Sequence, residues 1–306
     1  MTAKITKLLR TMLVYGAVGA AGCVYSVSAL AVSELGKGPK LLSDGVIVVD
    51  LSSDEVLYSK NATVERPIAS ITKLMTAMVT LDAKLPMEQK IRVTQEDVDT
   101  LRNSYSRMRV GSVHTRRELL QLALMSSENR AAAALARTYP HGRHAFYAKM
   151  NAKAKVLGMK RTRFVEATGL DSDNVSTAED LVKLVSAGLD YPLVRQITTT
   201  TNYDVRQKRV LKYRNSNPLV RNEDWQIGLS KTGYIKPAGH CVAMQAQIAD
   251  RPLIIVLLDA TGSRSIVADS KRIKRWIEAS AEASALAVQE QEDASVGEIT
   301  RVDEIF

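Results

Sequence analysis

The stretch "RPIASITKLMTAM", residues 66–78, places a serine and a lysine one helical turn apart at the start of an apolar segment. Because residues three apart lie on the same face of a helix, we expect Ser70 and Lys73 to point in the same direction. Helices of soluble proteins normally keep lysine on the face that contacts water. A lysine amine that is buried beside a hydroxyl can instead lose its proton, so the stretch predicts that Lys73 takes the proton of Ser70.

The order of the predicted strands and helices indicates an α+β fold. The chain has 306 residues, of which 45% are hydrophobic and 25% charged, enough for one large domain or two small ones. Strands open the chain, helices fill its middle, and strands with a last helix close it. We therefore expect an antiparallel sheet with flanking helices, an all-α lobe, and an active-site cleft between them. The predicted strands lie within 44–60, 203–213, 225–235, 241–249 and 252–260, and the predicted helices within 68–85, 115–129, 130–139, 143–159, 176–190 and 265–280.

Local signals mark several helix ends in this pattern. Ser176 and Glu179 have the spacing of a capping box at the start of one predicted helix. Gly158 is expected to end the helix that is predicted within 143–159. After the last predicted helix, residues 283–306 are acidic and only weakly periodic. These residues predict a flexible C-terminal tail.

Residues 1–31 have the pattern of a signal peptide. A basic segment precedes an apolar run rich in small residues, and Ala29-Leu30-Ala31 forms a small-x-small cleavage site. Two alternatives stay open. The run is long enough to remain as an uncleaved anchor, which would give loose membrane association, and Ala20–Cys23 resembles a lipoprotein box. All three alternatives predict that the protein is exported.

The net charge of +9 falls to about +6 when the three basic residues of the leader are removed. The basic residues cluster at 160–163, 206–214 and 270–275. These clusters lack interleaved aromatic residues and no nucleic-acid-binding motif is visible, so we predict solvated faces and no nucleic-acid partner. For an exported protein, an anionic cell-wall polymer is the more natural partner.

Cysteine and histidine residues point to no disulfide and no metal site. Cys23 would leave with the leader, and Cys241 would then have no partner for a disulfide. We expect Cys241 to be a buried structural thiol. The histidines have no metal-ligand spacing with each other, with cysteine or with acids, so no metal and no cofactor are predicted; they are His114, His141, His144 and His240.

Two further motifs follow Ser70 and Lys73 along the chain. "SEN" at 127–129 lies in a predicted turn between two helices, and "KTG" at 231–233 lies in a predicted strand. Each motif alone has an ordinary structural explanation, such as a helix cap or a turn. A Ser-x-x-Lys pair, then Ser-x-Asn, then Lys-Thr-Gly is the signature of serine penicillin-binding proteins and related β-lactamases.

The chain resembles the low-molecular-mass penicillin-binding proteins, the serine D-alanyl-D-alanine peptidases of bacterial cell walls. It is most similar to D-alanyl-D-alanine endopeptidases of the penicillin-binding protein 7 type. The resemblance covers residues 41–280, which are expected to form the D,D-peptidase catalytic domain with a β-lactamase-like fold. It rests on the stretches "ASITKLMTAMV", "LLQLALMSSENRAAAALA", "FVEATGLDSDNVSTAEDL" and "SKTGYIKPAGHCV".

The resemblance implies a periplasmic enzyme that cleaves the cross-link between D-alanine and meso-diaminopimelate in peptidoglycan. The reaction would pass through an acyl-Ser70 intermediate, and β-lactam antibiotics would acylate Ser70 as covalent inhibitors. A D-alanyl-D-alanine carboxypeptidase uses the same machinery and stays an alternative. A β-lactamase and a non-catalytic wall-binding protein are further alternatives.

The motifs assign expected roles near the nucleophile. Ser70 would begin a helix, where free backbone N–H groups favour developing negative charge. Lys73 would be the base, with a pKa lowered by burial and by the charge of Lys231. Ser127 would bridge the two lysines and relay the proton to the leaving amine. Asn129 would hold the substrate amide and fix Lys73.

The last motif is expected to bind substrate. Lys231 and Thr232 would bind a substrate carboxylate through charge and a hydroxyl. Gly233 would let the substrate backbone approach the strand. The N–H groups of Tyr234 and Ser70 would form the oxyanion hole, and substrate would lie along this strand as an added β-strand.

Glu166 in "FVEATGL" is expected to be structural. Class A β-lactamases use a glutamate in an E-x-x-L-N loop to activate water, but Leu-Asn does not follow Glu166 at that spacing. Histidine-assisted serine catalysis is also not expected, because no nucleophile elbow is visible.

Overall fold

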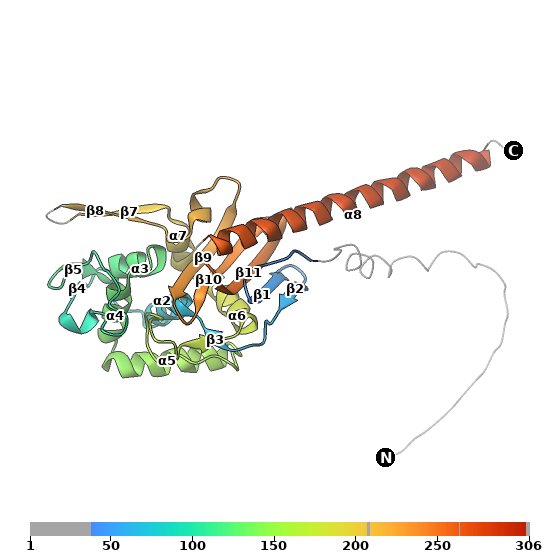
Figure 1. Cartoon of the computed structure of the whole chain (residues 1–306). Coiled ribbons are helices and arrows are strands. Elements are labelled where there is room, and N and C mark those ends of the chain that lie inside the picture. Colours follow the sequence, from blue (N-terminus) through green and yellow to red (C-terminus); the bar gives the residue numbers. More distant parts are fainter. Residues whose placement is uncertain (1–37, 207–208, 263, 304–306) are drawn as a thin grey trace, which may run out of the picture.

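The computed structural model describes residues 38–206, 209–262 and 264–303, and it is built on a five-stranded antiparallel sheet (Figure 1). The strands follow the order β2-β1-β11-β10-β9, so β9 lies at one edge. The predicted α+β fold with an antiparallel sheet is confirmed. The bounds are β1 Gly45–Asp50, β2 Val56–Lys60, β9 Gln226–Ile235, β10 Gly239–Ile248 and β11 Arg251–Ala260.

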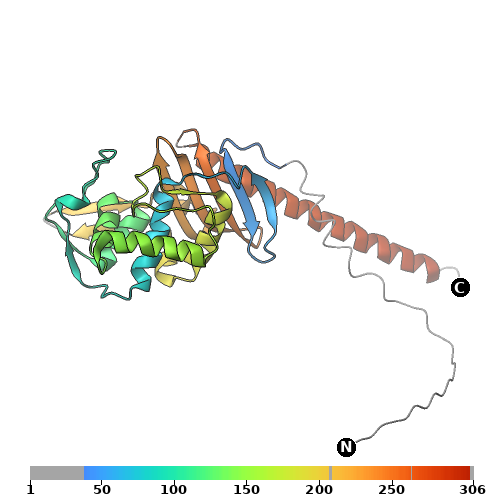
Figure 2. The ribbon, with the colours of Figure 1, turned by 90° about the horizontal axis from the view of Figure 1, so that it is seen from below.

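The helical lobe lies next to strand β9 and consists mainly of α2, α3, α4 and α5 (Figures 1 and 2). Helix α2 runs through its middle, and all residues from Thr72 to Thr80 are buried. It contacts α3, α4, α5, α6 and α7, as expected for a helix that is buried on every side. The bounds are α2 Thr72–Asp82, α3 Arg116–Met125, α4 Asn129–Arg137, α5 Gly142–Val156, α6 Ala178–Leu189, α7 Pro192–Thr199 and α8 Ser265–Asp303.

The sheet is buried on both faces because helices cover both. Successive side chains of a strand point to opposite faces, and all six residues of β1 are buried. Ile47 and Val49 pack in the core that the sheet shares with α6 and the helical lobe. Val46 and Val48 pack in a second core beneath α8. Burial on both faces explains why β1 and β11 are almost uninterrupted apolar runs.

Three two-stranded sheets complete the frame. Strand β3 (Arg66–Pro67) pairs with β6 (Val175–Ser176), and the β4–β5 pair lies within the lobe that was expected to be all-α. The strands predicted within 203–213 form a hairpin of their own, β7–β8. The remaining bounds are β4 Lys90–Arg92, β5 Val113–Thr115, β7 Asn202–Arg206 and β8 Val210–Arg214.

Helix α6 begins with a different cap from the predicted one. The side chain of Thr177 accepts a hydrogen bond from the N–H of Asp180, so Thr177 is the N-cap. Ser176 lies in β6, where it pairs with Arg66. The predicted capping box of Ser176 and Glu179 is therefore wrong, because strand pairing holds Ser176 one residue before the cap.

Two helices depart from the sequence pattern. Helix α7 was not predicted, although Pro192 occupies its first turn as a start signal. Helix α8 continues to Asp303 and extends away from the sheet (Figure 1). Residues 283–303, expected as part of a tail, are thus helical, in keeping with their many alanine, glutamate and glutamine residues. The flexibility of this end stays a prediction.

The predicted signal peptide, residues 1–31, lies outside the described residues. Within the described part of the chain, no helix combines the length and the apolar character needed to cross a membrane. Cys241 is a free and buried thiol, and burial raises its pKa to about 12. The prediction of a structural thiol is confirmed, since such a thiol is scarcely ever ionised at neutral pH.

The second core beneath α8 gives a stability prediction. Ile255 of β11 is fully buried there, so Ile255→Ala is expected to lower the free energy of unfolding by about 2–5 kcal/mol through lost burial and a new cavity. Val56 of β2 is 53% exposed, and Val56→Ala is the control, with an expected change within about 0.5 kcal/mol. Urea unfolding of both variants checks this. Equal losses of unfolding free energy in the two variants would contradict the presence of a core on each face of the sheet.

Candidate active site

Ser70 lies in a tight turn directly before helix α2. The turn is the 3-10 helix η1 (Ala69–Ile71), and the preceding residue, Ala69, has a positive φ of 47°. Such a backbone is uncommon for alanine and persists where the surrounding structure enforces it. The turn leaves Ser70 9% exposed, with its hydroxyl at the edge of an open groove.

Lys73 lies fully buried one turn further on, with a side chain that reaches back to Ser70. Its Nζ donates hydrogen bonds to Ser70 Oγ at 2.8 Å, Asn129 Oδ1 at 2.7 Å and the Thr168 carbonyl oxygen at 2.6 Å. Burial lowers the pKa of Lys73 from 10.5 to about 8, against the opposing charges of Glu166 and Glu128. The amine is thus placed and tuned to exchange a proton with the serine hydroxyl.

Ser127 and Asn129 come from the turn between α3 and α4. Ser127 has a φ of 62°, and its Oγ accepts a hydrogen bond from Lys231 Nζ at 3.0 Å. Asn129 begins α4; its Oδ1 contacts Lys73, and its Nδ2 donates to Ser104 Oγ at 2.9 Å. The left-handed backbone at Ser127 lets one short turn present two side chains to the same groove.

Lys231 and Thr232 come from strand β9 at the edge of the sheet. Lys231 is 1% exposed and donates to its neighbour's carbonyl, Thr232 O, at 2.7 Å. Burial lowers the pKa of Lys231 well below its ordinary value, and the charge of Lys73 lowers it further. The Thr232 hydroxyl donates to Ser216 Oγ at 2.7 Å, so two hydroxyls stand together at the wall of the open groove.

Burial lowers the pKa of both lysines, and the charge of Lys73 lowers that of Lys231 further. One expectation about the lysines needs correction. Ser127 was expected to bridge both amines. Among the described residues it is hydrogen-bonded to Lys231 and not to Lys73, because three other acceptors already surround the Lys73 amine.

Gly233 is required by the protein's own backbone. A Cβ at this position would lie 2.8 Å from the Ser70 nitrogen, closer than real contacts allow, and 3.0 Å from the Ala69 Cβ, which is already tight. The glycine therefore lets strand β9 approach the turn that carries Ser70. The next residue, Tyr234, is 58% exposed and stacks on His240 with ring centroids 4.2 Å apart.

An open groove of about 430 Å³ runs over these residues. Most of the predicted site residues line it, while the two lysines lie buried beneath it. Such a groove at a sheet edge suits an extended peptide, because an edge strand has free backbone donors and acceptors. The lining residues are Ser70, Ser104, Ser127, Asn129, Leu170, Ser216, Pro218, Thr232, Gly233, Tyr234, His240, Ile266 and Val267.

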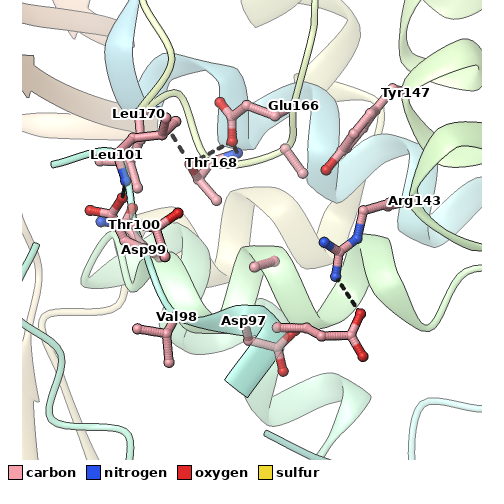
Figure 3. Close-up of a pocket in the computed structure, with 14 residues that line it drawn as sticks. Asp97, Val98, Asp99, Thr100, Leu101, Arg143, Tyr147, Glu166, Thr168 and Leu170 are labelled. Atoms are coloured by element: carbon pink, nitrogen blue, oxygen red, sulfur yellow. Dashed lines mark hydrogen bonds and ion pairs between the residues drawn. The ribbon is translucent and has the colours of Figure 1, made fainter. Parts of the chain in front are cut away.

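A smaller cavity of about 180 Å³ lies next to the groove (Figure 3). The two share Asn129 and Leu170 as lining residues. Glu166 and Thr168 form part of the wall of the cavity. The described residues contain no group of three or more histidine, cysteine, aspartate or glutamate side chains arranged to hold a metal ion.

The motifs did not reveal every group at the site. Thr168 contributes a backbone carbonyl, and a backbone carbonyl has no side-chain signature in a sequence. Gly169, which follows it, is a weak turn signal. Ser216 and Ser104 are single serines in loops, and no spacing relative to the motifs distinguishes them from other surface serines.

A serine hydroxyl bonded to a buried amine in an open groove is typical of serine acyl-transfer enzymes that use lysine as the base. Comparison with known protein families identifies the family of the chain. The chain belongs to the Peptidase_S11 family, described as D-alanyl-D-alanine carboxypeptidase, whose model matches residues 32–262. It is therefore a serine-type D-alanyl-D-alanine peptidase, as the motifs predicted.

Curated relatives and solved structures agree with this assignment. The D-alanyl-D-alanine endopeptidase of Escherichia coli (strain K12) is 46% identical over 83% of this chain and 83% of the relative. The enzyme of that name from Pseudomonas aeruginosa is 49% identical over 78% of each chain. The crystal structure of the Streptomyces K15 DD-transpeptidase is similar, with a TM-score of 0.73 and 26% identity over 78% of this chain and 98% of that chain. Penicillin-binding protein D2 from Listeria monocytogenes, in its cefotaxime-bound form, gives a TM-score of 0.69 and 30% identity over 78% and 97%.

The approach of the 166–170 turn to Ser70 gives a second prediction. Gly169 has a φ of 81°, and a Cβ there would lie 1.9 Å from the Ala69 carbonyl oxygen. Gly158 has a φ of 68° with no neighbour within 4 Å of its Cβ position. Alanine at either site costs about 1 kcal/mol of backbone strain, but only Gly169→Ala is expected to displace the serine turn.

Fluorescent penicillin labelling and thermal unfolding of both variants test this difference. We expect Gly158→Ala to lose stability and keep its labelling rate. Gly169→Ala should lose labelling by at least about tenfold, because small displacements of reacting groups are costly. Normal labelling of folded Gly169→Ala would show that the turn does not hold Ser70 in place.

Proposed function

We propose that this protein is a D-alanyl-D-alanine endopeptidase that hydrolyses D-alanyl cross-links of peptidoglycan through an acyl-Ser70 intermediate. The observation that carries the proposal is the 2.8 Å hydrogen bond between Lys73 Nζ and Ser70 Oγ at the base of an open groove. The two endopeptidases at 46% and 49% identity support the choice of reaction.

The first step forms an ester between Ser70 and the D-alanyl carbonyl carbon. The neutral amine of Lys73 takes the Ser70 proton, and Oγ attacks the carbonyl. The scissile C–N bond then breaks, and the leaving amine receives a proton through the Ser127 hydroxyl, with Lys231 as the donor behind it. In the second step, water gives a proton through Ser127 to Lys231 and attacks the ester carbonyl. Lys73 returns its proton to Ser70 Oγ as the C–O bond of the ester breaks and the acyl group leaves as the carboxylic acid.

Substrate orientation follows from the sheet edge. An extended peptide that pairs with β9 would bring its carbonyl to Ser70, with the N–H groups of Ser70 and Tyr234 as oxyanion donors. The amine of Lys231 and the hydroxyls of Thr232 and Ser216 would hold the carboxylate of the leaving residue. Asn129 would hold the substrate amide while its Oδ1 keeps the Lys73 amine in place.

The bound substrate carboxylate would also influence which of the two lysines is charged. Repulsion between the two buried amines makes a doubly charged pair unfavourable. A bound carboxylate beside Lys231 favours the positive charge there. Lys73 is then favoured in its neutral form, which is the form that can accept the Ser70 proton.

The close alternative is a D-alanyl-D-alanine carboxypeptidase, the activity in the description of the matched family. The same groups would serve, with a terminal D-alanine as the leaving residue. β-Lactams are proposed as covalent inhibitors at Ser70, since penicillin-binding protein D2 was solved in cefotaxime-bound and ampicillin-bound forms. Residues 1–31 are proposed as the export signal to the periplasm, and residues 41–280 as the catalytic domain.

Purified protein incubated with dimeric, D-alanyl-cross-linked muropeptides tests the reaction. Monomers without free D-alanine are expected, and Ser70→Ala should abolish the product. Ser53→Ala, in the exposed turn after β1, is the control and should cleave at the wild-type rate. Free D-alanine instead of monomers would identify a carboxypeptidase. Rapid turnover of a chromogenic cephalosporin would indicate a β-lactamase, and no product with no penicillin adduct would refute the enzymatic proposal.

The pH dependence of acylation tests the role of Lys73. With a pKa of about 8 rather than 10.5, about one amine in ten is neutral at pH 7, against fewer than about one in a thousand for an ordinary lysine. Penicillin acylation should therefore rise about tenfold per pH unit below pH 8 and level off above it. Lys73→Arg, which keeps its proton, should not label at any pH. A wild-type rate that still rises steeply near pH 10 would contradict the assignment.

A further inference from the structure

The Thr168 carbonyl is a backbone group in direct contact with both Lys73 and Ser70. It accepts a hydrogen bond from Lys73 Nζ at 2.6 Å and one from Ser70 Oγ at 3.4 Å. It belongs to a turn at residues 166–170, whose backbone is not part of a helix or strand. The position of a loop carbonyl must be fixed by other groups if it is to hold a lysine in one orientation.

Glu166 fixes the peptide unit that carries this carbonyl. The N–H of the same Thr168–Gly169 peptide donates to Glu166 Oε1 at 2.5 Å. One planar peptide group therefore has Lys73 at its oxygen end and a carboxylate at its nitrogen end. Polarisation along such a chain strengthens both hydrogen bonds.

The carboxylate of Glu166 is fully occupied by donors of the turn and by Asn174. Its Oε2 accepts from the N–H and the hydroxyl of Thr168, both at 2.5 Å. Its Oε1 accepts from Gly169 N–H at 2.5 Å and Asn174 Nδ2 at 2.8 Å. A carboxylate has about four lone-pair sites, so none is left to activate a water molecule. This agrees with the expectation that Glu166 does not act as the glutamate of class A β-lactamases does.

The turn is also tied to the helix that carries Lys73. Asn174 is fully buried and donates to Thr72 Oγ1 at 3.1 Å. Thr76 Oγ1 donates to the Ala167 carbonyl at 2.7 Å. Helix α2 thus holds Ala167 directly and Glu166 through Asn174. Glu166 in turn sets the orientation of the Thr168–Gly169 peptide, and Figure 3 shows Glu166 beside Thr168.

Resting on the proposed role of Ser70 as nucleophile, we propose that Glu166 is a positioning residue that holds the Thr168 carbonyl against the Lys73 amine and thereby aligns Lys73 with Ser70. Glu166 touches neither substrate nor the reacting atoms. It acts through one peptide group, and its negative charge acts on Lys73 through space.

The orientation of the Thr168 carbonyl and the charge of Glu166 have separable effects on the acylation of Ser70. Three charged groups influence or face Lys73: the carboxylates of Glu166 and Glu128, which favour its charged form, and the amine of Lys231, which disfavours it. Removal of the Glu166 charge lowers the pKa of Lys73, so the neutral base forms at lower pH. Loss of the turn's geometry instead lowers the acylation rate at every pH.

The test measures the rate constant of acylation by a fluorescent penicillin from pH 5 to pH 10. Glu166→Gln keeps the shape of the side chain, but its amide N–H group faces the donors that the carboxylate had bound. We expect the plateau of the acylation rate at high pH to fall about 10- to 100-fold. The rising part of the pH–rate profile should move to lower pH. Glu166→Asp keeps the charge but shortens the side chain. It should lower the rate and leave the rising part of the profile near its wild-type position.

Glu96→Gln is the matched control. Glu96 lines the same small cavity but pairs with Arg143 at 3.0 Å, with a side chain that is 66% exposed. Its rate and its pH–rate profile should match those of the wild type. This control separates a specific effect of Glu166 from a general effect of removing negative charge from the cavity.

Circular dichroism and thermal unfolding establish which variants fold. The proposal would be overturned if folded Glu166→Gln kept the wild-type rate and an unmoved pH–rate profile. It would also be overturned if the rising part of the profile moved equally in Glu96→Gln. If Glu166→Gln does not fold, Glu166→Asp decides: a wild-type rate overturns the proposal and a reduced rate supports it. Absence of penicillin labelling in the wild-type protein would refute the proposed function itself. This outcome differs from every result expected for the variants, because those are compared with a wild type that is labelled.

Discussion

The burial of a single amine is the constraint on which the site depends. Lys73 is fully buried beside Ser70, and an amine without water is stable only where acceptors surround it. Those acceptors come from three segments: the η1 turn, the start of α4 at Asn129, and the Thr168 carbonyl. Because these segments meet only in the folded chain, the lysine becomes a base through tertiary structure. The Ser-x-x-Lys spacing supplies only the shared helix face.

The sheet and the helical lobe supply different halves of the site. The lobe provides the nucleophile, its base and the Ser127 hydroxyl, and the sheet edge provides Lys231 and Thr232. Glycines at 169 and 233 let two backbones close on the serine turn, where any side chain would collide. The positive φ values at Ala69 and Ser127 lie at this same junction. Strain of this kind persists where packing from both sides enforces it.

The sequence predicts the parts of this site that depend on side-chain chemistry. Ser70, Lys73, Ser127 and Lys231 follow from three short motifs, and the apolar strands that form the sheet are visible as runs of β-branched and aliphatic residues. The structure brings these four side chains to one junction, linked in two hydrogen-bonded pairs. Their spatial convergence could be inferred because the motif order is specific.

Contributions of the backbone could not be predicted in the same way. The Thr168 carbonyl leaves no signature in a side chain, and the role of Gly233 depends on which backbone approaches it. Ser176 and Thr177 are adjacent cap candidates, and only the strand pairing of Ser176 decides between them. For Glu166 the sequence indicated a structural residue; its contact with the peptide bonded to Lys73 required coordinates.

Carbon-13 NMR of protein labelled at the lysine ε-carbon measures the central quantity directly. The Lys73 resonance can be assigned as the one that disappears in Lys73→Arg, and its chemical shift can be followed from pH 6 to pH 11. Burial predicts a titration midpoint of about 8 for this amine. A midpoint at the ordinary value of 10.5 would mean that Lys73 is charged throughout the neutral range, and the account of Ser70 activation would be wrong.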